Sequence, residues 1–153
     1  MKNELVHIPQ SGIEIFTNPD KSIQLEVKLE NETVWLTQKQ MAMLFDVKTP
    51  AINKHLKRIF EDGELSEKEV VSKMEITTRH GAMVDKTQHI ETNFYNLDAI
   101  LSVGYRVNSK NAISFRKWST KILKDYIIKG YAVRSNLQLQ HYNELKEVVA
   151  LMS

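Results

Sequence analysis

The chain has 153 residues, of which 42% are hydrophobic and 26% are charged, a balance that fits one soluble domain with at most a short appendage. It contains no cysteine, which excludes a disulfide scaffold and thiolate metal sites. No apolar run approaches the roughly 18 residues that a membrane-spanning helix needs, and the opening segment MKNELVHIPQ lacks the apolar stretch of a signal peptide, so we expect a cytoplasmic protein.

The net charge of +2 is distributed unevenly along the chain. Residues 38–60 carry five cations and one carboxylate, whereas residues 61–70 carry five carboxylates and one lysine. Residues 105–129 carry seven cations and a single aspartate. Two basic segments therefore flank an acidic one, and the net charge of the whole chain does not reveal this arrangement.

The first third of the chain alternates apolar and polar residues, the pattern of half-buried β-strands. The apolar positions are Ile13, Ile15, Ile23, Leu25, Val27 and Leu29. The turn-forming residues NPDK separate the two runs, and ENET precedes a third apolar run, Val34-Trp35-Leu36. The pattern predicts a small antiparallel sheet.

Two short helices, joined by about three residues, are predicted between residues 37 and 60. Thr37 is expected to cap the first helix, which ends near Asp46. Thr49 and Pro50 form the start signal of the second, a capping hydroxyl followed by proline at the first helical position, and Gly63 is expected to end it. Their buried faces should comprise Met41, Ala42, Leu44 and Phe45 in the first helix and Ile52, Leu56 and Ile59 in the second.

The second half begins with two β-prone stretches, residues 73–78 and 89–94, which predict a hairpin placed to serve as a wing. Asn96 or Asp98 is expected to open a helix that ends at Ser102, before a turn over the letters GYRVNS.

A longer helix should follow over residues 110–129, ended by Gly130. Its apolar face should comprise Ile113, Phe115, Trp118, Ile122, Leu123, Tyr126 and Ile127. The lysines of this helix are interpreted as solvated. Arg106, in the expected turn, is a candidate for either a structural bond or a phosphate contact. Residues 136–153 predict a solvated helix or the start of a coiled coil, as in a fragment of a longer protein.

The helix pair over residues 37–60 has the pattern of a helix-turn-helix, with Asp46 where a turn glycine is usual. The outer face of its second helix would present Thr49, Ala51, Asn53, Lys54, Lys57 and Arg58. These residue types can bind phosphates and base edges, so they are the predicted DNA-binding residues. The alternative is a protein-interaction adaptor without direct DNA binding, which uses the acidic residues 61–69 and the carboxy-terminal tail. The basic face of the second helix would then be solvated.

Signals for an enzyme are poor. The sequence has no phosphate-binding glycine loop and no nucleophile elbow, and no two histidines have the helical spacing of metal ligands. His80, Asp85 and His89 form the one histidine cluster in the sequence pattern, and Glu75, Asp85 and Glu91 are the carboxylates that a magnesium-dependent nuclease would need. We expect no catalytic residues, no metal, no cofactor and no small-molecule substrate.

The run FYNLDAILSVGYRVNSKNAISFRKWSTKILKDYIIKGYAV closely resembles the RhuM family of bacterial virulence-associated proteins. The segments SVGYRVNS, FRKW and LKDYIIKGY carry the likeness, and WLTQKQMAMLF matches the amino-terminal half of that family. The order of elements is more distantly similar to the Bro-N domain of phage antirepressor-like proteins. Both resemblances imply DNA binding, and neither supplies established site residues.

The predicted fold class is α+β, a small antiparallel sheet with a winged-helix-like helix-turn-helix and carboxy-terminal helices. Residues 10–135 should form the DNA-binding domain and residues 136–153 a helical tail. The expected partners are duplex DNA and a second copy of the chain, which would form a homodimer through the carboxy-terminal helix. We expect no association with a membrane. The expected role is that of a bacterial transcriptional or mobile-element regulator.

Overall fold

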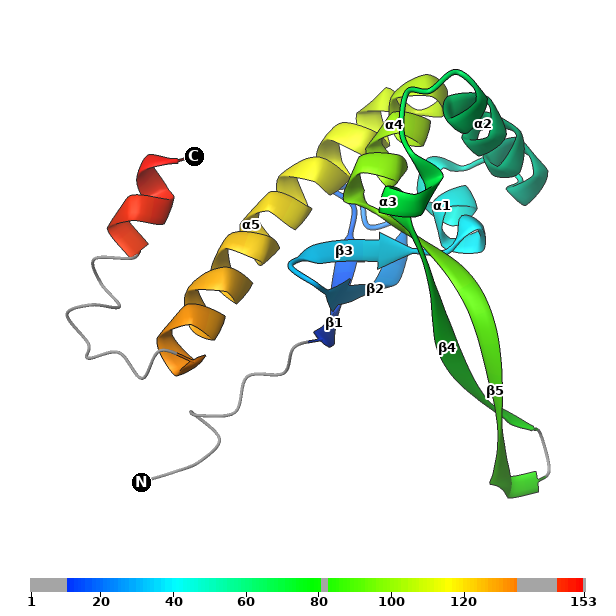
Figure 1. The fold of residues 1–153 in the computed structure, drawn as a ribbon, viewed down its shortest axis with the longest axis horizontal. Helices are drawn as coiled ribbons and strands as arrows, with labels where there is room; N and C mark the ends of the chain where they lie inside the picture. Colours follow the sequence, from blue (N-terminus) through cyan, green and yellow to red (C-terminus); the bar gives the residue numbers. More distant parts are fainter. Residues whose placement is uncertain (1–10, 81–82, 135–145, 153) are drawn as a thin grey trace.

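A computed structural model describes the backbone of residues 11–80, 83–134 and 146–152, and the side chains of these residues outside 11, 77–89 and 130–134. Within this part of the chain, a five-stranded antiparallel sheet is covered on one face by helices, and a long two-stranded ribbon projects from the body (Figure 1). The predicted α+β class with carboxy-terminal helices is therefore confirmed. The expected boundary at residue 135 lies outside the described residues.

The strand order in the sheet is β1-β2-β3-β5-β4. The strands are β1 (Ser11–Thr17), β2 (Gln24–Glu30), β3 (Thr33–Leu36), β4 (Val71–His80) and β5 (Met83–Asn96). The predicted amino-terminal sheet and the predicted hairpin are both present. Strand β3 pairs with only two residues of β5, Asn96 and Tyr95, so the rest of the β4–β5 ribbon extends beyond the sheet (Figure 1).

A two-residue turn joins β2 to β3. Asn31 and Glu32 both have positive φ, 54° and 62°, as a type I′ turn requires, and Thr33 pairs with Glu30 immediately beyond it. Asparagine tolerates this left-handed conformation better than most residues. The turn fixes the register in which Lys28 faces Trp35 across the two strands.

The helices follow the chain order α1 (Gln38–Phe45), α2 (Thr49–Glu61), α3 (Glu67–Val70), α4 (Leu97–Val107) and α5 (Ser109–Arg134). The one-turn helix α3 lies in the acidic segment, where no helix was predicted. Residues 146–151 are helical as well. No helix in the described ranges is both long enough and apolar enough to cross a membrane.

The main core lies between the helices and one face of the sheet. Alternation along β2 sends Leu25, Val27 and Leu29 to this face, where each is at most 4% exposed. The ring of Phe16 on β1 packs edge-on against Phe115 of α5, with ring centroids 5.2 Å apart. Burial of these side chains is the main stabilising term, worth about 1.5–3 kcal/mol each.

Two predicted helix boundaries are wrong. Helix α4 does not end at Ser102 but continues to Val107, so the expected turn GYRVNS is mostly helical. Gly104 lies inside it because the ring of Phe45 approaches so closely that an added Cβ would stand 2.5 Å from the ring. Helix α5 continues past Gly130 to Arg134, since a single glycine costs a helix only about 1 kcal/mol.

The predicted apolar face of α5 is partly wrong as well. Phe115 is buried and Trp118 packs against the core, as expected, but Ile113 and Ile127 are 39% and 41% exposed. Ala112 is buried in place of Ile113, Ile128 is buried in place of Ile127, and Ser119 is buried between them. Small side chains allow α5 to approach its neighbours closely, a preference that a search for large apolar residues overlooks.

Candidate nucleic-acid interface

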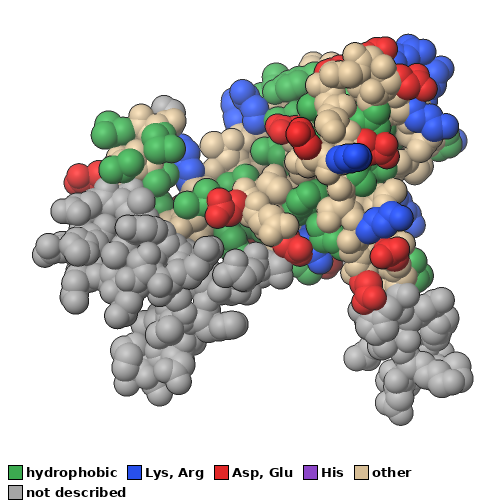
Figure 2. Space-filling view, viewed as in Figure 1, with side chains coloured by type: hydrophobic (Ala, Val, Ile, Leu, Met, Phe, Trp, Pro, Cys, Tyr) green, Lys and Arg blue, Asp and Glu red, His purple; other side chains and the backbone are tan. Residues whose placement is uncertain are grey.

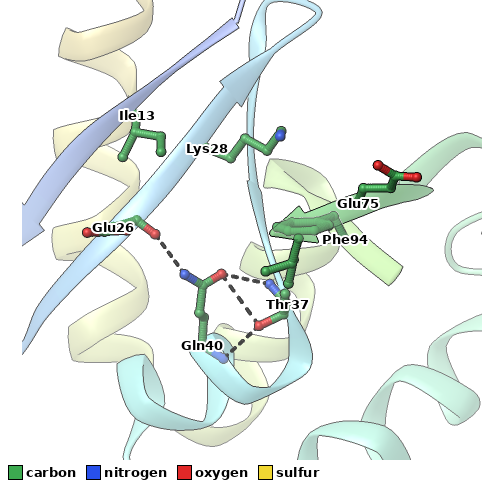
Figure 3. A pocket seen from close by; sticks show the side chains of 8 residues that line it. Ile13, Glu26, Lys28, Thr37, Gln40, Glu75 and Phe94 are labelled. Atoms are coloured by element: carbon green, nitrogen blue, oxygen red, sulfur yellow. Dashed lines mark hydrogen bonds between the residues drawn. The ribbon is translucent and has the colours of Figure 1, made fainter. Parts of the chain in front are cut away.

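The first helix of the candidate site, α1, begins with a reciprocal pair of hydrogen bonds. The backbone N–H of Gln40 donates to Oγ1 of Thr37 (3.1 Å), and the backbone N–H of Thr37 donates to Oε1 of Gln40 (3.0 Å). This is a capping box, and it confirms Thr37 as the predicted N-cap. Nε2 of Gln40 also donates to the backbone carbonyl of Glu26 (2.7 Å), which joins the start of α1 to the sheet (Figure 3).

The turn between α1 and α2 is three residues long. Asp46 adopts the left-handed conformation (φ 57°, ψ 49°), the geometry for which glycine is the usual residue. The following N–H of Val47 donates to the carbonyl of Ala42 (3.0 Å), and the Val47 side chain packs against the core. The predicted helix end near Asp46 is confirmed.

Helix α2 divides into a buried and an exposed face as predicted. Ile52, Leu56 and Ile59 are at most 2% exposed. Among the predicted DNA-binding residues, Ala51 is half-buried and the other five are exposed, namely Thr49, Asn53, Lys54, Lys57 and Arg58. The expectation that the Thr49 hydroxyl caps this helix is wrong. Lys48 is the N-cap and makes no side-chain capping bond, since the chain already turns one residue earlier.

The carboxyl end of α2 follows the predicted signal. The N–H of Glu64 donates to the carbonyl of Ile59 (3.0 Å) and the N–H of Gly63 to that of Phe60 (3.2 Å). Gly63 has a φ of 75°. These two bonds form a Schellman motif, for which glycine is the favoured residue at the left-handed position.

Four of the predicted residues line a shallow groove of about 290 Å³ on the exposed face of α2. They are Asn53, Lys54, Lys57 and Arg58, and Pro50 and Glu61 complete the lining. Basic side chains gather over α2 on the surface of the molecule, beside the acidic residues that follow it (Figure 2). Three cations in one groove favour an anionic partner, while the carboxylate of Glu61 at its end limits how far that preference extends along the helix.

A chain of polar side chains links α2 to the base of the ribbon. Nδ2 of Asn53 donates to Oε1 of Gln38 on α1 (3.5 Å), and Nε2 of Gln38 donates to the hydroxyl of Tyr95 on β5 (2.9 Å). Tyr95 is buried. Because one end of the chain is anchored in the core, the Asn53 amide has a preferred orientation on an otherwise solvated face.

Two asparagines at the junction of α4 and α5, Asn108 and Asn111, hold the carboxyl end of α1. Nδ2 of Asn108 donates to the carbonyl of Phe45 (3.1 Å), and Nδ2 of Asn111 donates to the carbonyl of Leu44 (2.7 Å). Carbonyls in the last turn of a helix have no partner within the helix, so these bonds satisfy groups that would otherwise be left unpaired. Oδ1 of Asn108 in turn accepts from the N–H of Asn111 (3.2 Å) at the start of α5.

The structure confirms a structural bond of Arg106, and the alternative role, a phosphate contact, stays a prediction. Its guanidinium forms an ion pair with Glu64, which joins the end of α4 to the segment after α2. His55 lies nearby on the flank of α2. Burial lowers the pKa of His55 below its usual value, and the positive charges of Arg106, Arg58 and Lys54 lower it further. This histidine therefore favours its neutral form.

Metal-binding arrangements are absent from the part of the chain whose side chains are described, where no group of three histidines and carboxylates converges. The side chains of His80, Asp85 and His89 lie outside it. Glu75 and Glu91 face each other in register across the ribbon.

Several contacts at this site were missed by sequence reasoning. Gln38 and Tyr95 are separated by 57 residues, and Asn111 and Leu44 by 67. No periodicity connects positions so far apart. The signal that was available is local: Gln40, three residues after Thr37, marks a capping box.

The molecule is thus an α+β protein in which a helix pair with a basic outer face is held on a sheet by two later helices. A model of the Virulence protein RhuM family matches residues 69–148, just over half of the chain, and the chain belongs to that family. The match begins at Glu69 within α3 and includes all of α4 and α5, with Asn108 and Asn111. Helices α1 and α2 precede the matched residues. No curated protein and no solved structure matches the chain.

Proposed function

We propose that this RhuM-family chain binds duplex DNA without catalysing a reaction, and that α1 and α2 act as its helix-turn-helix. The single observation that carries the proposal is the face of α2 that points away from the core. It presents Asn53, Lys54, Lys57 and Arg58 together along one shallow groove, with no apolar side chain except that of Pro50. This mixture of amide and cationic groups suits phosphates and the acceptor-rich edges of the major groove.

The turn geometry supports the same proposal. The left-handed residue Asp46 and the three-residue connection set α2 at an angle to α1, as a reading helix requires. The Asn53–Gln38–Tyr95 chain favours one orientation of the Asn53 amide before any partner arrives, which reduces the entropy lost on binding. Asparagine is the residue type that pairs bidentately with adenine.

The β4–β5 ribbon would lie beside the reading helix as the wing of a winged-helix arrangement. Among the described side chains of the ribbon, Glu75 and Glu91 face each other across the strands and Lys73 is the single cation, so this part attracts phosphate weakly. We therefore assign the affinity for DNA to α2 rather than to this part of the ribbon.

The proposal is tested by fluorescence anisotropy of a labelled duplex of random sequence, at two salt concentrations. The intact chain is expected to bind more weakly at the higher salt, with a slope of about −0.9 per neutralised phosphate in a log–log plot. Binding should be lost in the triple variant Asn53→Ala, Lys54→Ala, Lys57→Ala. Because all three side chains are exposed, the variant should fold normally.

A control matched in charge removes two exposed cations and one neutral side chain from α5 through Arg116→Ala, Lys117→Ala and Thr120→Ala. If affinity falls equally in the control, the attraction is diffuse and α2 is not the reading element. If the intact chain shows no salt-sensitive binding, the proposal is wrong, and the adaptor hypothesis based on the exposed carboxylates Glu61, Asp62, Glu67 and Glu69 takes its place.

A further inference from the structure

The second face of the sheet has no helix over it within the described residues. Its side chains follow from the strand registers: Ile13 and Ile15 on β1, Glu26, Lys28 and Glu30 on β2, Trp35 on β3, Phe94, Thr92 and Ile90 on β5, and Met74 and Ile76 on β4. Trp35, Met74 and Phe94 shield one another in a small satellite cluster, with Ile76 packed against it. The remaining apolar side chains of this face have less cover.

Three isoleucines on this face are strongly exposed. Ile13, Ile15 and Ile90 are 64%, 46% and 44% accessible to solvent. Soluble monomers rarely leave several large aliphatic side chains uncovered on one surface. Burying each of them would contribute about 1.5–3 kcal/mol at most. A partner that covers the face would therefore gain a substantial apolar area.

A hollow of about 430 Å³ separates the two exposed groups. It exists because β3 ends at Leu36, so that beyond this point no strand fills the space between β2 and the ribbon. Ile13 lies on one wall, Phe94 with Glu75 on the other, and Gln40 closes one end (Figure 3). The rest of the lining comprises Glu26, Lys28, Thr37 and Ile76. The hollow can accept an aliphatic side chain from a partner.

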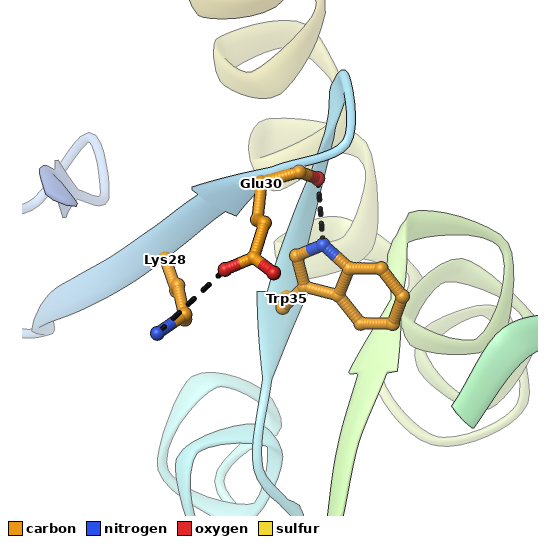
Figure 4. Close-up of polar contacts among 3 residues, drawn as sticks. All are labelled: Lys28, Glu30 and Trp35. Atoms are coloured by element: carbon orange, nitrogen blue, oxygen red, sulfur yellow. Dashed lines mark hydrogen bonds and ion pairs between the residues drawn. The ribbon is translucent and has the colours of Figure 1, made fainter. Parts of the chain in front are cut away.

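The charged residues of the face form a short ladder along β2. Lys28 stands between Glu26 and Glu30, with its Nζ atom 3.9 Å from Oε1 of Glu30 and 5.8 Å from the centre of the Phe94 ring. The indole N–H of Trp35 donates to the backbone carbonyl of Glu30 (2.8 Å), which fixes the neighbouring strand (Figure 4). Lys28 is the single cation among the described side chains of this face.

We infer that a second copy of this chain covers this face, in an isologous dimer through the open side of the sheet. A carboxylate–lysine–carboxylate ladder is complementary to itself, because a two-fold axis can bring Lys28 of each copy to Glu26 of the other. The apolar residues on both sides of the ladder then meet one another. DNA would meet one lysine, Lys28, and three carboxylates, those of Glu26, Glu30 and Glu75, so it does not compete for this face. The inference does not depend on DNA binding.

The test is sedimentation velocity of the full chain, without DNA, from low to high micromolar concentration. The wild-type chain is expected to form a dimer. Ile13→Asp and Ile90→Asp should each raise its dissociation constant by about tenfold or more, because each places a carboxylate in the buried interface. The control is Ile127→Asp, which introduces the same change at an equally exposed isoleucine of α5 and should leave the dimer intact.

The charge ladder provides a second, independent measurement. Lys28→Glu should weaken the dimer, and adding Glu26→Lys to the same chain should restore it, because the swap recreates the complementary ladder. Far-ultraviolet circular dichroism of every variant checks that the fold is unchanged. A wild-type chain that remains monomeric would overturn the inference. So would a dimer that survives Ile13→Asp and Ile90→Asp and dissociates instead with Leu151→Asp, because the carboxy-terminal tail would then be the interface.

Discussion

The substitution Gly104→Ala sets two effects of opposite sign against each other. Gly104 lies inside α4, where alanine is favoured over glycine by about 1 kcal/mol on helix propensity alone. The new Cβ, however, would stand 2.5 and 2.6 Å from two ring atoms of Phe45 and 2.8 Å from the Cβ of Ala112. All three separations are far below van der Waals contact, so α4 or its neighbours must move.

The neighbours cannot move cheaply. Phe45 is 1% exposed and Ala112 is fully buried, so a shift of either is passed on to the packing of α1 or α5. Overpacking of this kind costs about 1–3 kcal/mol, and three close contacts place the cost near the upper end. After the propensity gain, we expect a net loss of about 2 kcal/mol, or about 4–8 °C in Tm for a chain of this size.

Urea unfolding followed by circular dichroism measures this loss. Gly12→Ala is the matched control, because an added Cβ there has no atom within 4 Å, and it should not destabilise the protein. The double variant Gly104→Ala, Phe45→Leu should lose about 1 kcal/mol less than the sum of the two single variants, since the smaller side chain removes the contact. If Gly104→Ala instead raises the free energy of unfolding, α4 is governed by propensity alone and the close packing of α1 on α4 is refuted.

Three further predictions concern the helix pair. Asn111→Ala should lower the free energy of unfolding by about 1–3 kcal/mol, because it leaves the carbonyl of Leu44 unpaired, and a change within about 0.5 kcal/mol in urea unfolding would contradict this role. Asp46→Gly should leave stability unchanged or slightly higher, because glycine adopts the left-handed conformation freely, and it should tighten DNA binding in the anisotropy assay by removing a carboxylate beside α2; weaker binding would refute this prediction. The lowered pKa of His55 means that the unfolded chain binds its proton more readily, so stability is greatest above the ordinary histidine pKa of about 6.5 and falls as the pH drops from there toward the lowered pKa of the folded state. His55→Gln should reduce the slope of unfolding free energy against pH in that window, and an unchanged slope would show that other groups cause it.

The parts of the fold that sequence could predict are those set by neighbouring residues. Period-two alternation located β1 and β2, although Ile13 and Ile15 of β1 are exposed, and an apolar run after a turn located β3. Period 3.6 separated the buried Ile52 and Leu56 from the exposed face of α2. Thr37 and Gly63 marked helix ends through capping chemistry that acts over a few residues. Five of the six predicted site residues are exposed and Ala51 is half-buried, because the exposed face of a short helix follows from its buried face. Their role in DNA binding stays a prediction.

The errors arise where a distant part of the chain determines the local structure. Gly104 suggests a turn from its neighbours alone, but its missing side chain makes room for Phe45, which lies 59 positions earlier. The large apolar side chain of Ile113 favours burial, but Ile113 is exposed and the small Ala112 beside it is buried, because α5 packs closely on its neighbours. The sequence pattern also did not predict that β3 would end at Leu36. Because β3 is short, a hollow remains beside Phe94 between β2 and the ribbon.

The family match and the proposed reading helix occupy different parts of the chain, and the contacts between them link one to the other. Residues 69–148 include Gly104, Asn108 and Asn111, and all three act on α1. They hold its last turn, which determines where the chain turns into α2. Substitutions at these positions should therefore weaken any function of the α2 face without altering a residue on that face. If α2 served only as a solvated surface, such substitutions would reduce stability and leave the affinity of the remaining folded protein for DNA unchanged.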